Sequence, residues 1–265
     1  MKTRMPTEFV FSLFALLTAV ILVHSIYLTI IRPNADAILA EQKAAMQSDP
    51  EYVVEPSIYV IMRDAEQEAC FVLMLWAFAI LAYKGWRARA EAQLLRQEFI
   101  PIAEGMKILP EDTREYSRAI QGLPYDEQRM FVPRVLLSAL ARFGATRNVQ
   151  DVSSSTHTLI VNESERLESE LSMIRYIAWA IPSIGFIGTV RGIGGALAQA
   201  HRAVEGDISG VTENLGVAFN STFIALLISI VLMFVVYQLQ LTQERLVLDT
   251  ENYVDEHLIR HMQSG

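Results

Sequence analysis

Charged residues are missing from four long stretches of this chain, and this gap constrains the fold more than any other feature. The stretches cover 9–31, 69–83, 176–197 and 214–243, and Arg191 is the single Asp, Glu, Lys or Arg within them. About 20 consecutive apolar residues suffice for a helix to cross a bilayer. In lipid, a helix satisfies its own backbone hydrogen bonds. The sequence therefore predicts an all-α integral membrane protein with four transmembrane helices.

The four predicted spans differ in quality. The stretch 9–31 is too long for a signal-peptide core and no small-residue cleavage site follows it, so we expect a retained helix. The stretch 69–83 is wholly apolar but, at about 1.5 Å per residue, falls short of the membrane thickness. Lys84 and Trp86 can extend it by reaching to the membrane surface. The stretch 176–197 is the least hydrophobic span.

The side of the membrane follows from the distribution of basic residues. Four crossings place 1–8, 84–175 and 244–265 on one side and 32–68 and 198–213 on the other. The first side carries 17 Lys and Arg residues and the second carries 4. Basic residues accumulate in cytoplasmic segments. We therefore expect a multi-pass protein of the bacterial inner membrane, with both termini in the cytoplasm.

The region between the second and third spans is predicted to be helical, as long cytoplasmic extensions of the spans packed in a bundle. A charged helix can continue from 84 towards 109, with Pro101 as its kink or end. A second helix is expected from Asp126 to Gly144, and a third from Asp151 to Arg175 that runs into span three. The apolar residues at helical spacing are Ile160, Leu167, Leu171 and Ile174 there, and Leu239, Leu246 and Tyr253 in the tail.

These segments divide the chain into six parts. They are 1–31 (N-terminus and first span), 32–68 (extracytoplasmic loop), 69–83 (second span), 84–175 (cytoplasmic helical region), 176–243 (third span, loop and fourth span) and 244–265 (cytoplasmic C-terminal helix).

Several classes of function are disfavoured. A net charge of −8 without a Lys/Arg stripe argues against nucleic-acid binding. Cys70 is the only cysteine and no Cys/His cluster has metal-ligand spacing, so we expect no metal site and no bound cofactor. The glycines of 192–195 lack the Lys-Ser/Thr of a phosphate-binding loop. No nucleophile–base pair is present, so the chain is not expected to be an enzyme.

Spans three and four each carry a stripe of small residues with one threonine in the middle. The stripe residues are Ala178, Pro182, Gly185, Thr189, Gly192 and Ala196 in span three, and Ala218, Thr222, Ala225 and Ser229 in span four. Small stripes let membrane helices pack closely. Alternatively, they line a space that water or another helix enters, where a hydroxyl can both donate and accept a hydrogen bond. No carboxylate lies inside any span, so a membrane site that binds an ion would need an acid from a partner.

Two motifs in these spans carry a resemblance to a known family. Pro182-x-x-Gly185-x-x-Gly188-Thr189-Val190-x-Gly192 is followed by Leu215-x-x-Ala218-Phe219-x-x-Thr222-x-x-Ala225-Leu226. This pair resembles the two pore helices of the MotA/TolQ/ExbB proton channel family, over roughly residues 150–265. The four-span topology is similar to that of MotA. Val217 and Ala225 depart from the family pattern, which has a glutamate in ExbB-type members and a glycine at these positions.

The resemblance implies a function and partners. It implies a homopentamer around a dimer of a single-span MotB/ExbD/TolR-like partner, whose membrane Asp carries H⁺, with Na⁺ as the alternative ion. Ion flow would drive a rotary motor, with this chain as the stator subunit and 176–243 as the channel core. Thr189 and Thr222 would form the ion pathway. The pore- or partner-facing residues would be Ala178, Pro182, Gly185, Gly192, Ala218, Ala225 and Ser229.

Two points stay open at the sequence level. Arg191 can reach the membrane surface or a lipid phosphate, or face a neighbouring subunit or the pore mouth. A non-conducting membrane scaffold that recruits or regulates partners through its cytoplasmic helices is the alternative function.

Overall fold

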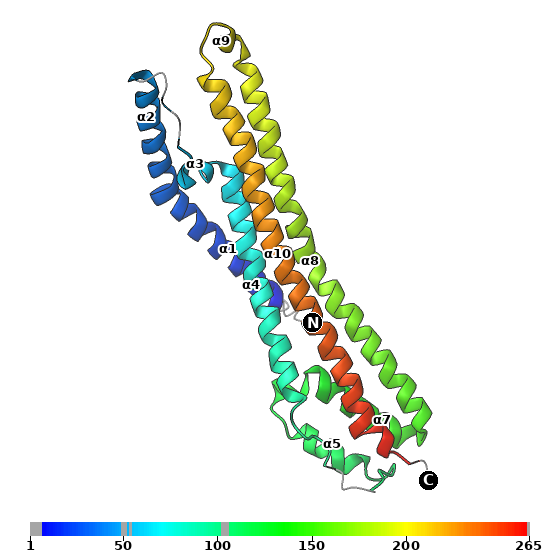
Figure 1. Ribbon diagram of the computed structural model, residues 1–265. Helices are drawn as coiled ribbons and strands as arrows, with labels where there is room; N and C mark the ends of the chain where they lie inside the picture. Colours follow the sequence, from blue (N-terminus) through cyan, green and yellow to red (C-terminus); the bar gives the residue numbers. More distant parts are fainter. Residues whose placement is uncertain (1–6, 49–51, 53–54, 102–105, 264–265) are drawn as a thin grey trace, which may run out of the picture. The chain divides into compact units, whose positions relative to one another are not determined.

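The computed structural model describes residues 7–48, 52, 55–101 and 106–263. These residues are almost entirely helical and contain no β-strand, which confirms the all-α prediction (Figure 1). The helices are α1 Thr7–Ile26, α2 Arg32–Ser48, α3 Ile58–Ile61, α4 Ala65–Leu94, α5 Thr113–Gln121, α6 Tyr125–Gln128, α7 Phe131–Thr146, α8 Val149–Ala198, α9 Ala200–Val204 and α10 Ser209–His257, with a π-helical turn η1 Tyr27–Ile31 and a 3-10 turn η2 Ile259–His261.

Four helices are long and apolar enough to cross a membrane. They are Glu8–Met46, Ala65–Leu94, Val149–Ala198 and Ser209–His261. Each contains one of the four uncharged stretches, so the chain is a multi-pass membrane protein. The helices extend beyond their apolar parts, and α8 and α10 have 50 and 49 residues.

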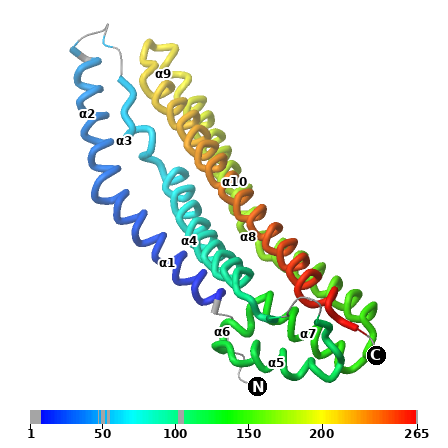
Figure 2. The backbone as a smooth tube through the Cα atoms, turned by 60° about the horizontal axis from the view of Figure 1, so that its bottom comes forward, coloured from blue at the N-terminus to red at the C-terminus, as the bar shows by residue number. Residues whose placement is uncertain are grey.

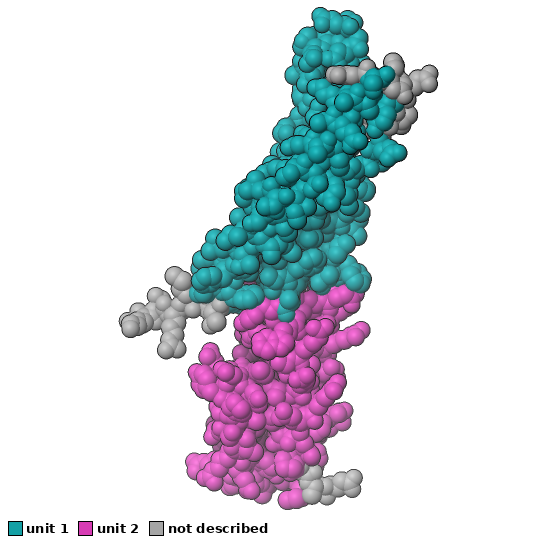
Figure 3. Space-filling model, turned by 90° about the vertical axis from the view of Figure 1, so that its left-hand side faces the viewer, with its two compact units in different colours: residues 1–82, 173–236 teal, residues 83–172, 237–265 magenta. Residues whose placement is uncertain are grey.

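The chain forms two compact units, coloured separately in Figure 3. Unit 1 contains residues 1–82 and 173–236, and unit 2 contains 83–172 and 237–265. The helices α4, α8 and α10 each contribute residues to both units.

In unit 1, the first span packs on the second. Val23, Tyr27 and Ile31 are buried against residues of α4. The indole of Trp76 donates a hydrogen bond to the backbone oxygen of Ser12 at 2.9 Å. Figures 1 and 2 also show α8 and α10 side by side along their length, joined by the turn that contains α9. This pairing brings the two small-residue stripes into one interface.

The helix of the first span continues into the predicted loop, which the sequence did not suggest. It passes through η1 into α2, up to Ser48. The cause is local: Pro33 has no backbone N–H, and the preceding turn widens so that the Arg32 N–H bonds to the Tyr27 oxygen. The Asn34 side chain donates to the oxygen of Ile30 at 2.6 Å.

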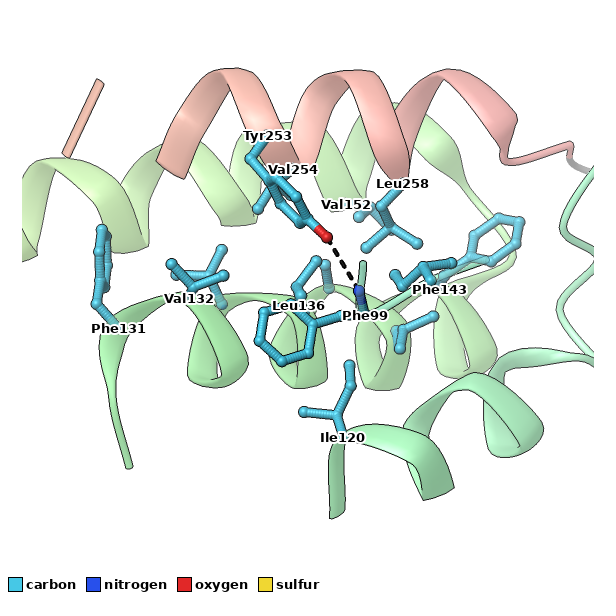
Figure 4. Packing of buried hydrophobic residues seen from close by; sticks show 14 of the residues in the cluster. Phe99, Ile120, Phe131, Val132, Leu136, Phe143, Val152, Tyr253, Val254 and Leu258 are labelled. Atoms are coloured by element: carbon cyan, nitrogen blue, oxygen red, sulfur yellow. Dashed lines mark hydrogen bonds between the residues drawn. The ribbon is translucent and has the colours of Figure 1, made fainter. Parts of the chain in front are cut away.

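Unit 2 has its own hydrophobic core, shown in Figure 4. Its centre is α7, whose buried residues pack on α8 and α10; Val132, Leu136 and Phe143 are within this core. Tyr253 contributes its ring, and its hydroxyl accepts a hydrogen bond from the Phe99 N–H at 3.1 Å and donates to the oxygen of Gln97 at 3.0 Å. The apolar residues predicted at helical spacing in α8 and α10 are buried or partly buried.

Two helix predictions in unit 2 need correction. The charged helix after span two ends at Leu94, well before Pro101, because Phe99 and Ile100 turn into the core. Helix α5 was not predicted, since Tyr116 and Ile120 are its only large apolar residues in the core, and a single pair four residues apart gives no periodic signal. The predicted helix from Asp126 to Gly144 is interrupted and becomes α6 and α7. The continuous helix from Asp151 through span three is confirmed as α8.

A candidate ion-pathway site between two membrane helices

The two threonines predicted to act together are in direct contact. Thr189 of α8 and Thr222 of α10 form a hydrogen bond between their hydroxyls. The Thr189 hydroxyl lies 3.1 Å from the oxygen of Ala218, and the Thr222 hydroxyl 3.1 Å from that of Gly185. Both side chains are only partly buried. The structure therefore places two linked hydroxyls between the helices, where each can donate one proton and accept another.

Glycine at 185 and 192 makes this contact possible. A Cβ atom on Gly185 would lie 2.5 Å from the Ala225 Cβ and 3.1 Å from the Ser221 oxygen. On Gly192 it would lie 2.6 Å from backbone atoms of α10, which cannot move aside. The helices approach each other too closely for any side chain at these positions.

The proline of span three has a structural partner in span four. Pro182 lies inside α8 and cannot donate the hydrogen bond that the oxygen of Ala178 would otherwise accept. The Ser229 hydroxyl of α10 donates to that oxygen at 3.2 Å. An unpaired carbonyl inside a membrane is costly. Ser229 therefore compensates for Pro182, a role that the sequence pattern did not reveal.

The predicted stripes consequently face each other within one chain. Ala178, Ala218 and Ala225 are buried at this interface. Close packing of α8 on α10 explains the small residues, as the first of the two sequence interpretations proposed. The partial exposure of Thr189 and Thr222 leaves the second interpretation open for the threonines. Whether the stripe also faces a pore or a partner stays a prediction.

Arg191 is paired inside the chain. Its guanidinium makes two hydrogen bonds to the Glu66 carboxylate, at 2.6 and 2.8 Å, and lies 3.4 Å from Asp64. Both acids sit at the start of α4. The sequence interpretations assigned Arg191 to lipid, a neighbouring subunit or the pore mouth, and none of them included this ion pair. The sequence did contain a signal for an ion pair, because the one charged residue within the spans needs a counter-charge.

A second ion-paired acid lies on the same turn of α4. The Glu68 carboxylate contacts the His24 ring nitrogen Nδ1 at 2.6 Å and Arg32 at 2.5 Å. Glu66 and Glu68 thus link α4 to α8 and to the first helix. Several acids of the predicted outer loop are therefore held in ion pairs. The open depression beside them has a volume of about 520 Å³, and its charged lining residues are Arg32, Arg63, Arg191, Asp36, Asp64 and Glu66.

In the described part of the chain, no group of three His, Cys, Asp or Glu residues could hold a metal ion. The polar groups beside Thr189 and Thr222 are hydroxyls and backbone carbonyls. Such a set can hydrogen-bond water or a protonated carboxyl group, but it cannot itself store a charge.

Comparison with known proteins supports a channel family. The family model described as the MotA/TolQ/ExbB proton channel family matches residues 128–252, which include α7, the whole of α8 and α10 up to Asn252. Both threonines lie inside the match. No curated protein and no solved structure matches the chain at a significant level.

Proposed function

Residues 128–252 place this chain in the MotA/TolQ/ExbB proton channel family, and on that premise we propose that it is the channel-forming stator subunit of an ion-driven membrane motor. A proton-channel role in an energy-coupling complex is the general role of this family. The observation that carries the specific proposal is the contact of Thr189 with Thr222 between the two matched membrane helices.

The polar groups of the site determine what the partner must supply. The uncharged stretches contain no carboxylate, so spans three and four offer no acid beside the threonine pair that could bind and release a proton. We propose that a single-span MotB/ExbD/TolR-like partner brings an Asp to the threonine pair. The hydroxyls would then hydrogen-bond that carboxyl group in its protonated and ionised states, because a hydroxyl serves as donor or acceptor.

The assembly and its location complete the proposal. We propose a homopentamer around two copies of the partner, in the inner membrane of a bacterium, with both termini and unit 2 in the cytoplasm. The basic bias of these segments supports this orientation. H⁺ is the proposed ion, as in the family description.

One observation favours the alternative of a non-conducting scaffold. Both threonine hydroxyls already have backbone partners in the isolated chain, so they can serve helix packing alone. Unit 2 also has a core of its own that could present a surface to other proteins. The two proposed functions differ in whether ions cross the membrane through this protein.

Proton flux through vesicles containing the chain and its co-purified partner tests the proposal. Thr189→Val combined with Thr222→Val keeps the side-chain shape and removes both hydroxyls, so flux should fall to background while the partner still co-purifies. Thr242→Val is the matched control, because that hydroxyl of α10 bonds only to the Gln238 oxygen of its own helix. Full flux in the double variant would overturn the pathway, and absence of flux in the unaltered complex would favour the scaffold.

A further inference from the structure

Unit 2 contains a partly buried series of alternating positive and negative side chains, which is separate from the threonine site. Lys84 bonds to Glu170 at 2.9 Å, and Arg166 lies 3.7 Å from the same carboxylate. Arg166 and Arg134 each bond to Glu163 at 2.5 Å. Lys84 and Glu163 are each only 5% exposed. Both carboxylates thus have two cationic neighbours.

A third carboxylate beside this chain lacks such pairing. Glu91 of α4 is 9% exposed and lies about two turns beyond the apolar stretch 69–83. No ion pair joins it to a described lysine or arginine. Its hydrogen-bond donor is the backbone N–H of Phe131, in the first turn of α7. A buried ionised carboxylate without a close cation is strongly disfavoured.

A small cavity adjoins Glu91. Its volume is about 30 Å³, and its polar lining consists of Lys84, Arg87, Glu91, Arg166, Glu170 and Gln243. About one water molecule fits into such a volume and finds several hydrogen-bonding partners there. A water molecule in this cavity would be the immediate proton acceptor or donor of the Glu91 carboxyl group.

We propose that Glu91 is a proton-binding site of unit 2, occupied in the packed bundle, and that release of its proton weakens the packing of α4 on α8. The protonated group keeps a carbonyl oxygen for the Phe131 N–H and needs no counter-ion. The ionised group would face Glu163 across the interface. This site is separate from the threonine pathway and does not depend on it.

The charged groups around Glu91 shift the pKa of its carboxyl group in both directions. Burial raises the pKa of the Glu91 carboxyl group above its ordinary value, and the negative charge of Glu163 raises it further. The Arg87 guanidinium, the Phe131 N–H and Arg166 lower this pKa by less. Lys84 and Glu170 also line the shared cavity, and α10 contributes the neutral Gln243. Because the net shift is upward, the stability gained from proton binding is fully present below the ordinary pKa and is lost as the pH rises through the raised one.

Infrared difference spectroscopy of the full-length protein in detergent, titrated with pH, detects a protonated carboxyl group directly. We expect one carboxylic-acid C=O band that persists above the pH at which the exposed carboxyl groups have ionised, that disappears at still higher pH and that is missing from Glu91→Gln. Glu165→Gln is the control, because Glu165 is exposed on α8. The band should persist in this control. Persistence of the band in Glu91→Gln, or its loss in Glu165→Gln, would overturn the proposal.

A second variant keeps the test decisive if Glu91→Gln does not fold. Glu163→Gln removes the negative charge that opposes ionisation of Glu91, so the band should disappear at a lower pH than in the unaltered protein. An unchanged midpoint, or a shift to higher pH, would contradict the assignment. Absence of the band from the unaltered protein at every pH would do the same.

Discussion

Lys84 is a lysine held in the interior of unit 2, directly after the second apolar stretch. Its side chain is 5% exposed, whereas that of its partner Glu170 is 28% exposed. A buried ammonium group requires a counter-charge, since desolvation is expensive and removal of one partner leaves an uncompensated charge. The two members of this pair should therefore differ in what their loss costs.

Glu170→Gln should destabilise the protein more than Lys84→Met. The first change removes the Glu170 carboxylate from the more buried of the two charges, which costs up to about 3 kcal/mol. The second leaves Glu170 partly solvated and still close to Arg166. Thermal unfolding of the purified variants in detergent measures the difference, and Lys84→Met combined with Glu170→Leu should recover part of the loss. Equal destabilisation by the two single changes would contradict this account.

At the scale of elements, α8 and α10 form an antiparallel pair with a regular register. Ala178 meets Ser229, Gly185 meets Thr222, and Gly192 meets Ala218, so contacts move along the helices in opposite directions. The helices are held together by backbone proximity and by hydroxyl-to-carbonyl bonds. Of the ionisable side chains, His157 of α8 contacts the Glu251 carboxylate of α10 at 3.1 Å, whereas Arg191 pairs with Glu66 of α4.

Gly192→Ala should disrupt this pair, and Gly194→Ala should not. The added methyl group on Gly192 would overlap the backbone of α10, at a cost of about 1–3 kcal/mol for overpacking. Gly194 has open space around it, so alanine there should be neutral or stabilise α8 by up to about 1 kcal/mol. Thermal unfolding of both variants in the same detergent separates the two cases. Equal stability of the two would rule out the close approach at Gly192.

At the scale of the whole molecule, four crossings create two sides, and each side has an exposed position suitable for labelling. Glu205 lies in the turn between α9 and α10, and Gln150 lies at the start of α8. The native Cys70 is fully buried, so it should not react with a thiol reagent. Labelling of a variant would therefore report on the introduced cysteine alone.

A membrane-impermeant maleimide should label Glu205→Cys in intact cells stripped of their outer membrane. Gln150→Cys should be labelled only after the membrane is permeabilised, because basic residues concentrate on its side. The unaltered protein should stay unlabelled in both conditions. Labelling of Gln150→Cys in intact cells would reverse the proposed orientation.

Much of the fold follows from the sequence because it depends on local properties. An uncharged stretch long enough to cross the bilayer can only be a helix there, so the four spans and the continuous helix α8 were predictable. The threonine pair was also predictable in outline, since residues three and four apart share one helix face. The end of α4 and the existence of α5 were not, because they depend on how Phe99, Ile100 and Ile120 pack into the core of unit 2.

The sequence by itself determined that this chain crosses the membrane four times and that spans three and four carry matching small stripes. Only the tertiary structure decided what those stripes contact: Gly192 adjoins the backbone of α10, and Ser229 bonds to the oxygen freed by Pro182. It also decided the partners of Arg191 and the burial of Glu91. Helix formation in lipid depends on neighbours in the sequence, whereas the Arg191–Glu66 pair and the bond from Ser229 to the Ala178 oxygen join residues 125 and 51 positions apart.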